Sequence, residues 1–279
     1  MRDMPSTFVA LVTPMCAAGG IDWQAWRELL AWHVKYSQGV LILGTTGEAP
    51  TIHEAERLQL IIEAKRITAN QLPLWVGISS NDSKIAIGYA RQAEALGADG
   101  CMLSLPYYNR PTQQGIIDHF RTVAEQMAGP LMLYHVPTRT SSAILPSTWY
   151  ALTTIPRIVA VKDAAEDCFT TLARLQAYGS KWHFYSGQDS NALAYVQAGG
   201  YGSVSVAANL LPQSYSRMIK AAKIELRTEA ERRARWLGPL FSFLESAESN
   251  PISIKWLLHL SGKMSATLRL PLQSLQAPF

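Results

Sequence analysis

Lys162 follows a short apolar segment, residues 158–161, that contains three β-branched side chains. This composition is typical of a strand buried on both faces of a sheet. An amine at the end of such a strand is poorly hydrated, which disfavours its charged form, and a neutral amine can form a Schiff base with a carbonyl compound. A lysine that begins a loop and extends into solvent is the alternative, and the segment alone does not decide between them.

Tyr134 is separated from Lys162 by one complete strand, helix and strand unit. We therefore expect the phenol and the amine at the tops of adjacent strands, facing one interior. A phenol in that position can transfer protons during carbinolamine formation, dehydration and carbon–carbon bond formation. The alternative is an aromatic cap with its hydroxyl in water. His135 lies on the alternating face of the same strand end, so a structural role is expected for it.

Two further segments carry polar groups that suit an anionic substrate. Residues 44–48, with the sequence GTTGE, contain Thr45 and Thr46 in a turn whose hydroxyl and backbone N–H groups could hold a carboxylate or phosphate. A plain strand-to-helix turn explains the same motif equally well. Arg139 follows a proline and could offer a planar pair of donors to a carboxylate, or could pair with a nearby acid at the rim.

The elements that must position these residues recur as eight short apolar runs separated by segments of helical periodicity. Eight such units are the number that closes a TIM barrel, whose active site lies at the carboxyl ends of the strands. An open nucleotide-binding sheet would need a glycine-rich turn after its first strand, and none follows Val12. The runs are residues 8–12, 40–43, 74–78, 100–103, 130–133, 158–161, 183–185 and 202–206.

The sequence predicts an α/β protein with two parts. Residues 1–225 are expected to form the (β/α)8 barrel. Residues 226–279 are expected to form a C-terminal helical extension packed on that barrel, because helical periodicity continues past one closing helix with no Gly-, Ser- or Pro-rich linker.

Composition excludes several classes of protein. Hydrophobic residues make up 48% of the chain and charged residues 16%, which allows a large core, and the net charge of +4 is small. The basic residues form no run, so nucleic acid is not an expected partner. Cys16, Cys101 and Cys168 are odd in number and widely spaced, which indicates neither a disulfide framework nor a metal site. No apolar run is long enough for a membrane helix or a signal-peptide core, so a soluble, cytoplasmic protein is expected.

Two stretches together resemble the dihydrodipicolinate synthase and N-acetylneuraminate lyase superfamily. They are residues 39–56, which include GTTGE, and residues 134–163, which begin with YHVP and end with VAVKD. The resemblance implies a class I aldolase barrel in which Lys162 forms an imine with pyruvate. It also implies that Tyr134 acts as proton donor and acceptor, and that no metal or organic cofactor is needed. Thr46 and the backbone of Val204 would hold the pyruvate.

Within this superfamily the chain is most similar to the synthases, which condense pyruvate with L-aspartate 4-semialdehyde to 4-hydroxy-tetrahydrodipicolinate on the lysine and diaminopimelate route. The similarity implies a proton relay of Thr45, Tyr108 and Tyr134, and a semialdehyde carboxylate bound by Arg139. Because the tyrosine matching Tyr108 crosses a subunit interface in the synthases, a homodimer at least, and commonly a homotetramer, is implied.

Three other functions stay open. Another pyruvate-dependent lyase of the superfamily, such as a sugar-acid or 4-hydroxy-2-oxoglutarate aldolase, shares the imine lysine and the tyrosine. An N-acetylneuraminate lyase fits less well, because Thr45 and Tyr108 match the synthase relay. A barrel that serves only as a binding module is expected to have lost Lys162 or Tyr134, and both are present.

Some positions depart from the synthase pattern. Ala165 and Glu166 replace a small hydroxylated residue and a glycine, and Gln188 replaces an acid, which leaves the shape of the pocket open. At the site for feedback by lysine, two residues match the inhibited synthases and three do not, so weak or absent inhibition by lysine is predicted. The matching residues are Asn81 and Tyr107, and the differing ones are Glu54, Arg57 and Ile85.

Overall fold

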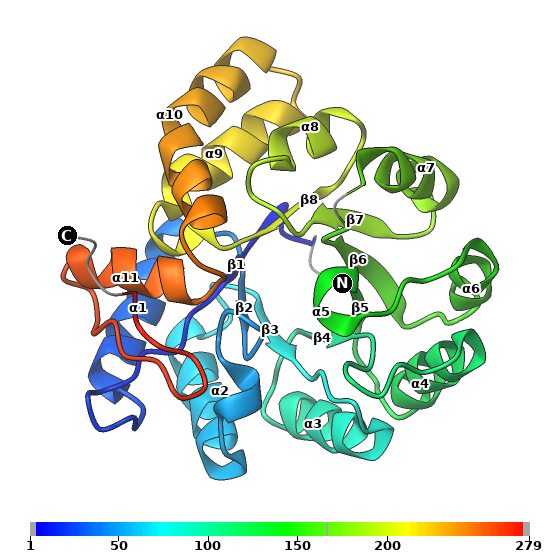
Figure 1. Ribbon diagram of the computed structural model, residues 1–279, viewed down its shortest axis with the longest axis horizontal. Coiled ribbons are helices and arrows are strands. Elements are labelled where there is room, and N and C mark those ends of the chain that lie inside the picture. Colours follow the sequence, from blue (N-terminus) through cyan, green and yellow to red (C-terminus); the bar gives the residue numbers. More distant parts are fainter. Residues whose placement is uncertain (1–3, 166, 276–279) are drawn as a thin grey trace.

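Eight parallel strands close into a barrel in the order β1 to β8, with β8 paired to β1 (Figure 1). The computed structural model describes residues 4–165 and 167–275. This architecture confirms the predicted TIM barrel, and the strands follow the eight apolar runs. They are β1 Thr7–Ala10, β2 Val40–Ile42, β3 Leu74–Gly77, β4 Gly100–Ser104, β5 Leu131–His135, β6 Ile158–Asp163, β7 His183–Ser186 and β8 Gly202–Ser205.

Helices surround the barrel, and the last two helices of the chain form an extension beside the ring. The helices of the ring are α1 Trp23–Tyr36, α2 Glu54–Thr68, α3 Ser83–Ala95, α4 Gln113–Glu125, α6 Pro146–Leu152, α7 Cys168–Tyr178, α8 Ala192–Gln197 and α9 Pro212–Lys223. The short helix α5 Pro137–Thr140 lies inside this ring, near the centre of the view in Figure 1. The extension consists of α10 Arg227–Ser246 and α11 Ile252–Leu260, and short 3-10 turns lie at η1 Ala49–Thr51 and η2 Ala207–Asn209.

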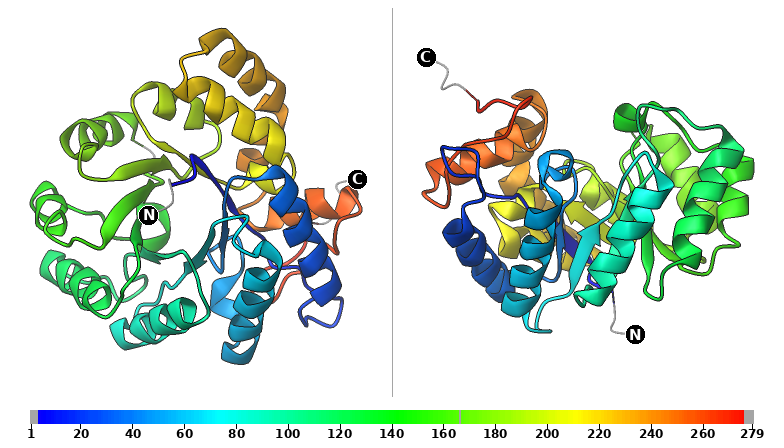
Figure 2. Two further views of the ribbon diagram at one scale, coloured as in Figure 1. Left: turned by 180° about the vertical axis from the view of Figure 1, so that it is seen from behind. Right: turned by 90° about the horizontal axis from the view of Figure 1, so that it is seen from below.

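The helical extension packs on one side of the barrel. Helix α10 contacts α9 and α8, and α11 contacts α10 and η2. Figures 1 and 2 show α11 beside α1, and after α11 the ammonium of Lys263 lies 3.9 Å from the centre of the Trp32 ring. In the described part of the chain, no helix is both long and apolar enough to cross a membrane.

Short polar side chains begin several helices, as the sequence suggests. Asp82 precedes α3 and accepts a hydrogen bond from the Lys84 N–H at 2.8 Å. Thr112 caps α4 in the same way through the Gly115 N–H. These caps satisfy N–H groups that have no partner inside the helix, so the boundaries of the ring helices follow local sequence.

Large side chains fill the barrel interior, so the barrel is a packed core that ends in a site rather than a channel. Every strand contributes at least one residue to this interior cluster. The cluster consists of Phe8, Ala10, Leu41, Trp75, Met102, Met132, Tyr134, Val136, Ala160, Ala164, Tyr185 and Val204.

Strands β5 and β6 are longer than the apolar runs that predict them. The runs end at residues 133 and 161, whereas the observed strands continue to His135 and Asp163. Parallel pairing continues through the polar positions, with Tyr134 opposite Lys162 and His135 opposite Asp163. Tyr134 and Lys162 are therefore held by the sheet itself, not by the loops that follow it.

Candidate active site

Lys162 and Tyr134 form a buried pair inside the end of the barrel. The amine Nζ lies 4.3 Å from the centre of the Tyr134 ring, and the two residues are 6% and 7% exposed. Among the described residues, no carboxylate forms an ion pair with Lys162. An amine enclosed by apolar groups and touched by a phenol has the surroundings that Schiff-base chemistry needs.

His135 and Asp163, the next residues on β5 and β6, lie on the opposite face of the sheet from Tyr134 and Lys162, and they form a hydrogen-bonded support. His135 donates from Nδ1 to Asp163 Oδ1 at 3.2 Å, and Arg174 donates from Nε to the other Asp163 oxygen at 3.0 Å. Burial alone would raise the pKa of Asp163, but the His135 hydrogen bond and the Arg174 charge outweigh it and lower that pKa. The structural role predicted for His135 agrees with this arrangement, which fixes β5 against β6 behind Lys162.

The GTTGE turn at residues 44–48 is held in a strained but well-supported conformation. Leu43 and Glu48 have left-handed backbones, with φ of 56° and 55°. A β-carbon at Gly77 would lie 2.2 Å from the Leu43 carbonyl oxygen, so only glycine permits β3 to approach this turn. Thr13 fixes the far side by donating to the Gly47 carbonyl at 2.7 Å. The turn that presents Thr45 is thus held by β3 and by the segment that follows β1.

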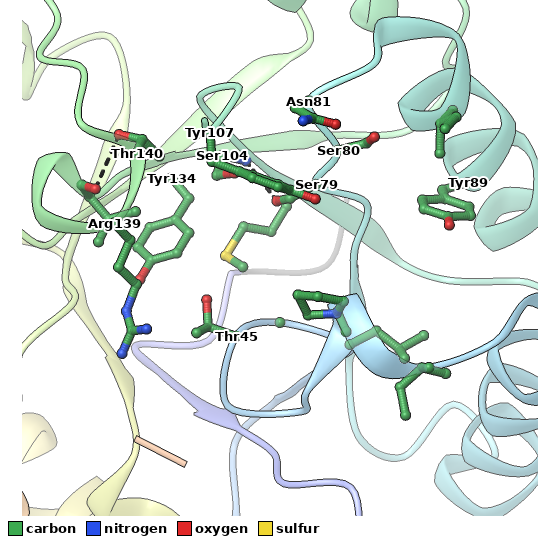
Figure 3. Close-up of a pocket in the computed structure, with 18 of the residues that line it drawn as sticks. Thr45, Ser79, Ser80, Asn81, Tyr89, Ser104, Tyr107, Tyr134, Arg139 and Thr140 are labelled. Carbon is green, nitrogen blue, oxygen red and sulfur yellow. Dashed lines mark hydrogen bonds between the residues drawn. The ribbon is translucent and has the colours of Figure 1, made fainter. Parts of the chain in front are cut away.

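A cavity of about 420 Å³ opens beside this turn. Figure 3 shows Thr45, Tyr134 and Arg139 grouped on one side of it, with Ser80 and Tyr89 on the other. This volume is ample for two small acids. Lys162 is not among the residues that line the cavity, although its amine contacts Tyr134, which does.

Of the other predicted site residues, Arg139 lines the cavity, whereas Thr46, Val204 and Tyr108 do not. Thr46 is buried and does not line the cavity, and Val204 lies in the barrel interior with Tyr134. Arg139 is exposed at the rim, where one of its N–H groups donates to the Asn250 carbonyl at 3.2 Å. Tyr108 is 89% exposed and does not line the cavity of its own chain.

Two of the positions that depart from the synthase pattern, Ala165 and Gln188, follow β6 and β7 directly. The Ala165 N–H donates to Asp163, so the segment after β6 is tied to the support behind Lys162. Gln188 accepts from Asn191 and lines a second cavity with Asp189. Glu166 lies outside the described residues. Within the described chain, no group of three or more His, Cys, Asp or Glu side chains could hold a metal ion.

Sequence reasoning missed a buried ion pair that anchors the GTTGE turn. Lys255 of α11 is fully buried and donates to Glu48 Oε1 at 2.5 Å and to the Thr13 carbonyl at 3.0 Å. The other Glu48 oxygen accepts the Arg269 N–H at 3.0 Å. Burial lowers the pKa of Lys255, while the Glu48 charge opposes that shift. The helical extension therefore supports the turn that carries Thr45.

We expect Lys255→Met to lower the free energy of unfolding by about 3 kcal/mol, because it leaves the Glu48 carboxylate buried without its cation. Chemical denaturation measures this change. The exposed Lys220→Met in α9 is the matched control and should change stability by no more than about 0.5 kcal/mol. The double variant Lys255→Met with Glu48→Met should lose less than the single one, and an equal or larger loss would contradict the pairing.

The chain matches the model of the dihydrodipicolinate synthetase family over residues 3–278. A relative from Nitrosococcus oceani, a 4-hydroxy-tetrahydrodipicolinate synthase, is 40% identical over 267 residues, which cover 95% of this chain and 91% of the relative. The chain belongs to the dihydrodipicolinate synthetase family. A second synthase, from Pseudomonas aeruginosa, is 37% identical over 95% of this chain and 91% of its own.

Solved structures agree with this family. The chloride-inhibited dihydrodipicolinate synthase from Acinetobacter baumannii, complexed with pyruvate, has a TM-score of 0.95 and 36% identity, and the match covers 98% of this chain and 94% of that one. The enzyme from Aquifex aeolicus has a TM-score of 0.94 and 32% identity, covering 98% and 93%. The family fold therefore extends through α10 and α11.

Proposed function

We propose that this protein is a lyase that condenses pyruvate with L-aspartate 4-semialdehyde to give 4-hydroxy-tetrahydrodipicolinate, in lysine and diaminopimelate biosynthesis. The observation that carries the proposal is the buried Lys162 amine against the Tyr134 ring, at 4.3 Å, in a chain of the dihydrodipicolinate synthetase family. The relatives named 4-hydroxy-tetrahydrodipicolinate synthase support the choice of substrates.

The reaction begins at Lys162. The neutral amine adds to the keto carbon of pyruvate, and loss of water from the carbinolamine gives the imine. Tyr134 donates the proton that the departing water needs and accepts one when the imine becomes an enamine, whose carbon then attacks the aldehyde. Thr46 and the Val204 backbone hold the pyruvate carboxylate. No metal or organic cofactor takes part, because the imine nitrogen itself serves as the electron sink.

The second substrate binds in the cavity. Arg139 binds its carboxylate at the rim, where the guanidinium uses one N–H group on Asn250 and keeps others free for a planar anion. Thr45 lies in the same part of the cavity as Tyr134 and Arg139 (Figure 3), and it passes protons to and from the phenol. Tyr108 completes the relay from a neighbouring copy of the chain.

The assembly is a homotetramer, and the reaction takes place in the cytoplasm. An aromatic side chain that is 89% exposed supports a subunit contact at Tyr108, because large apolar surfaces seldom face water without a partner. A monomeric dihydrodipicolinate synthase variant matches this fold with a TM-score of 0.94 and 29% identity, so a folded barrel does not require assembly. Sedimentation at assay concentration measures the state of this chain.

A panel of aldehydes tests the proposed reaction. Purified protein is incubated with pyruvate and with aspartate semialdehyde, glyoxylate or sugar-derived aldehydes, and pyruvate consumption is followed for each. We expect kcat/KM to be highest with aspartate semialdehyde. A higher kcat/KM with glyoxylate or with a sugar-derived aldehyde would instead identify another aldolase that uses the same imine.

We also expect lysine to inhibit this enzyme weakly or not at all. The cavity contains the buried guanidinium of Arg57, and the apolar Ile85 lines the same wall. A second cation in this space would be repelled, with no described carboxylate lining the cavity to offset it. Steady-state assays across lysine concentrations check this expectation, and strong inhibition at micromolar lysine would contradict it.

A further inference from the structure

The carboxylate of Asp189 holds the backbone directly after β8. Its Oδ2 accepts hydrogen bonds from the Val206 N–H at 3.0 Å and from the Ala207 N–H at 2.7 Å. Hydrogen bonds to an ionised carboxylate are stronger than those between neutral groups. Asp189 belongs to the loop after β7, the strand that neighbours β8 in the barrel (Figure 1). Its side chain therefore ties this loop to the end of the next strand.

The loop that carries Asp189 is itself fixed to the end of β6, the strand of Lys162. The Gly187 N–H donates to the Asp163 carbonyl at 2.7 Å. A β-carbon at Gly187 would lie 2.7 Å from the β-carbon of Ala164, so only glycine permits the loop to approach β6 this closely. The position of β6 is thus passed through this loop to the end of β8.

A buried amide fixes the same segment from the side of β1. Asn209 is fully buried, and its Nδ2 donates to the Ala10 carbonyl at 2.7 Å and to the Val206 carbonyl at 2.9 Å. Its Oδ1 accepts the Val12 N–H at 3.1 Å. The backbone after β8 is therefore held from both neighbouring strands, by Asn209 on one side and by Asp189 on the other.

Asp189 acts here as a hydrogen-bond acceptor and not as the partner of a cation. Among the described residues, none forms an ion pair with it. Burial raises the pKa of Asp189, whereas the Ser205 and Tyr215 hydroxyls and the two backbone N–H groups oppose that rise. Because these partners are all neutral donors, an amide oxygen in place of the carboxylate should serve the two N–H groups as well.

We propose that Asp189 is a positioning residue, which holds the end of β8 so that the backbone of Val204 meets the carboxylate of pyruvate in a fixed geometry. The inference rests on the proposed function, in which that backbone helps to hold pyruvate. The first N–H group that Asp189 binds lies two residues after Val204 in the chain. Lys162 and Tyr134 lie on β6 and β5 and keep their own support when this clamp is lost.

Asp189→Leu and Asp189→Asn test this role in the full-length protein. Leucine removes the acceptor, whereas asparagine keeps a side-chain oxygen for the two N–H groups. Borohydride trapping of pyruvate on Lys162 is measured across pyruvate concentrations, together with steady-state kcat and KM. We expect Asp189→Leu to raise both KM for pyruvate and the pyruvate concentration for half-maximal trapping by at least about tenfold, with kcat within about threefold of wild type. Asp189→Asn should stay within about threefold of wild type in all three quantities.

Asp99→Leu is the matched control. The Asp99 carboxylate also accepts a backbone N–H, that of Leu74 at 2.9 Å, but at the amino end of β3, which is the opposite end of the barrel from the site. Loss of this hydrogen bond should lower the unfolding temperature, as Asp189→Leu does, and should leave KM for pyruvate unchanged. The comparison separates a loss of stability from a loss of position at β8.

An unchanged KM in Asp189→Leu would overturn the positioning role, as would an equal rise in Asp99→Leu or in Asp189→Asn. If Asp189→Leu does not fold, Asp189→Ala, which also lacks the acceptor, should show the same rise in KM. A wild type that forms no pyruvate adduct would overturn the proposed function and the positioning role together. A wild-type adduct with unchanged half-saturation in the variant would overturn the positioning role alone.

Discussion

Lys162→Met is expected to lower kcat/KM by at least about 10³-fold, because no other described amine contacts Tyr134 in the barrel interior. Methionine fills the same space, so the barrel should keep its fold. Borohydride reduction in the presence of pyruvate, followed by mass spectrometry of the peptide that contains residue 162, measures imine formation directly. The wild-type peptide should carry the reduced pyruvate adduct, and the variant peptide should not.

The matched controls for Lys162→Met are two other lysines. Lys220→Met removes an exposed amine and should leave both adduct and turnover unchanged. Lys255 is fully buried, but its amine is held by Glu48 and does not line the cavity, so it should form no adduct. A reduced pyruvate adduct on Lys255, or turnover that survives in Lys162→Met, would show that the chemistry lies elsewhere.

The contrast between these two buried lysines shows what the sequence could reveal. Lys162 follows a continuous apolar run, so the sequence offers burial as one of two readings of this lysine, the other being a lysine that begins a loop and extends into solvent. Lys255 lies on a helix, where a charged residue every few positions normally faces water. Its burial depends on Glu48, which is 207 positions away in sequence, and a pairing of that length has no local signal.

The same distinction applies to the site as a whole. The register that places Tyr134 opposite Lys162 follows from one strand, helix and strand unit, and the sequence predicts it from spacing alone. The apolar runs predict the ends of β5 and β6 too early, because a polar side chain usually marks the end of a strand that is buried on both faces. Tertiary pairing overrides that local preference.

Tyr134→Phe is expected to lower kcat by about 10²- to 10³-fold, which is the usual loss when one acid–base group is removed. Two tyrosines flank Lys162 in register, Tyr134 on β5 and Tyr185 on β7, and both face the barrel interior. They differ in what their hydroxyls do. Tyr185 is fully buried, its hydroxyl donates to the Pro5 carbonyl at 2.8 Å, and burial raises its pKa further from neutrality.

Tyr134, in contrast, lines the cavity, which leaves its side chain accessible to the substrate. Tyr185→Phe is therefore the control, and it should cost about 1 kcal/mol of stability with at most a few-fold loss of kcat. Because the ring of Tyr134→Phe still packs against the amine, borohydride should still trap pyruvate on Lys162, only more slowly. Rapid-quench trapping measures this rate. A larger loss of kcat in Tyr185→Phe than in Tyr134→Phe would assign the proton-transfer role to Tyr185 on β7.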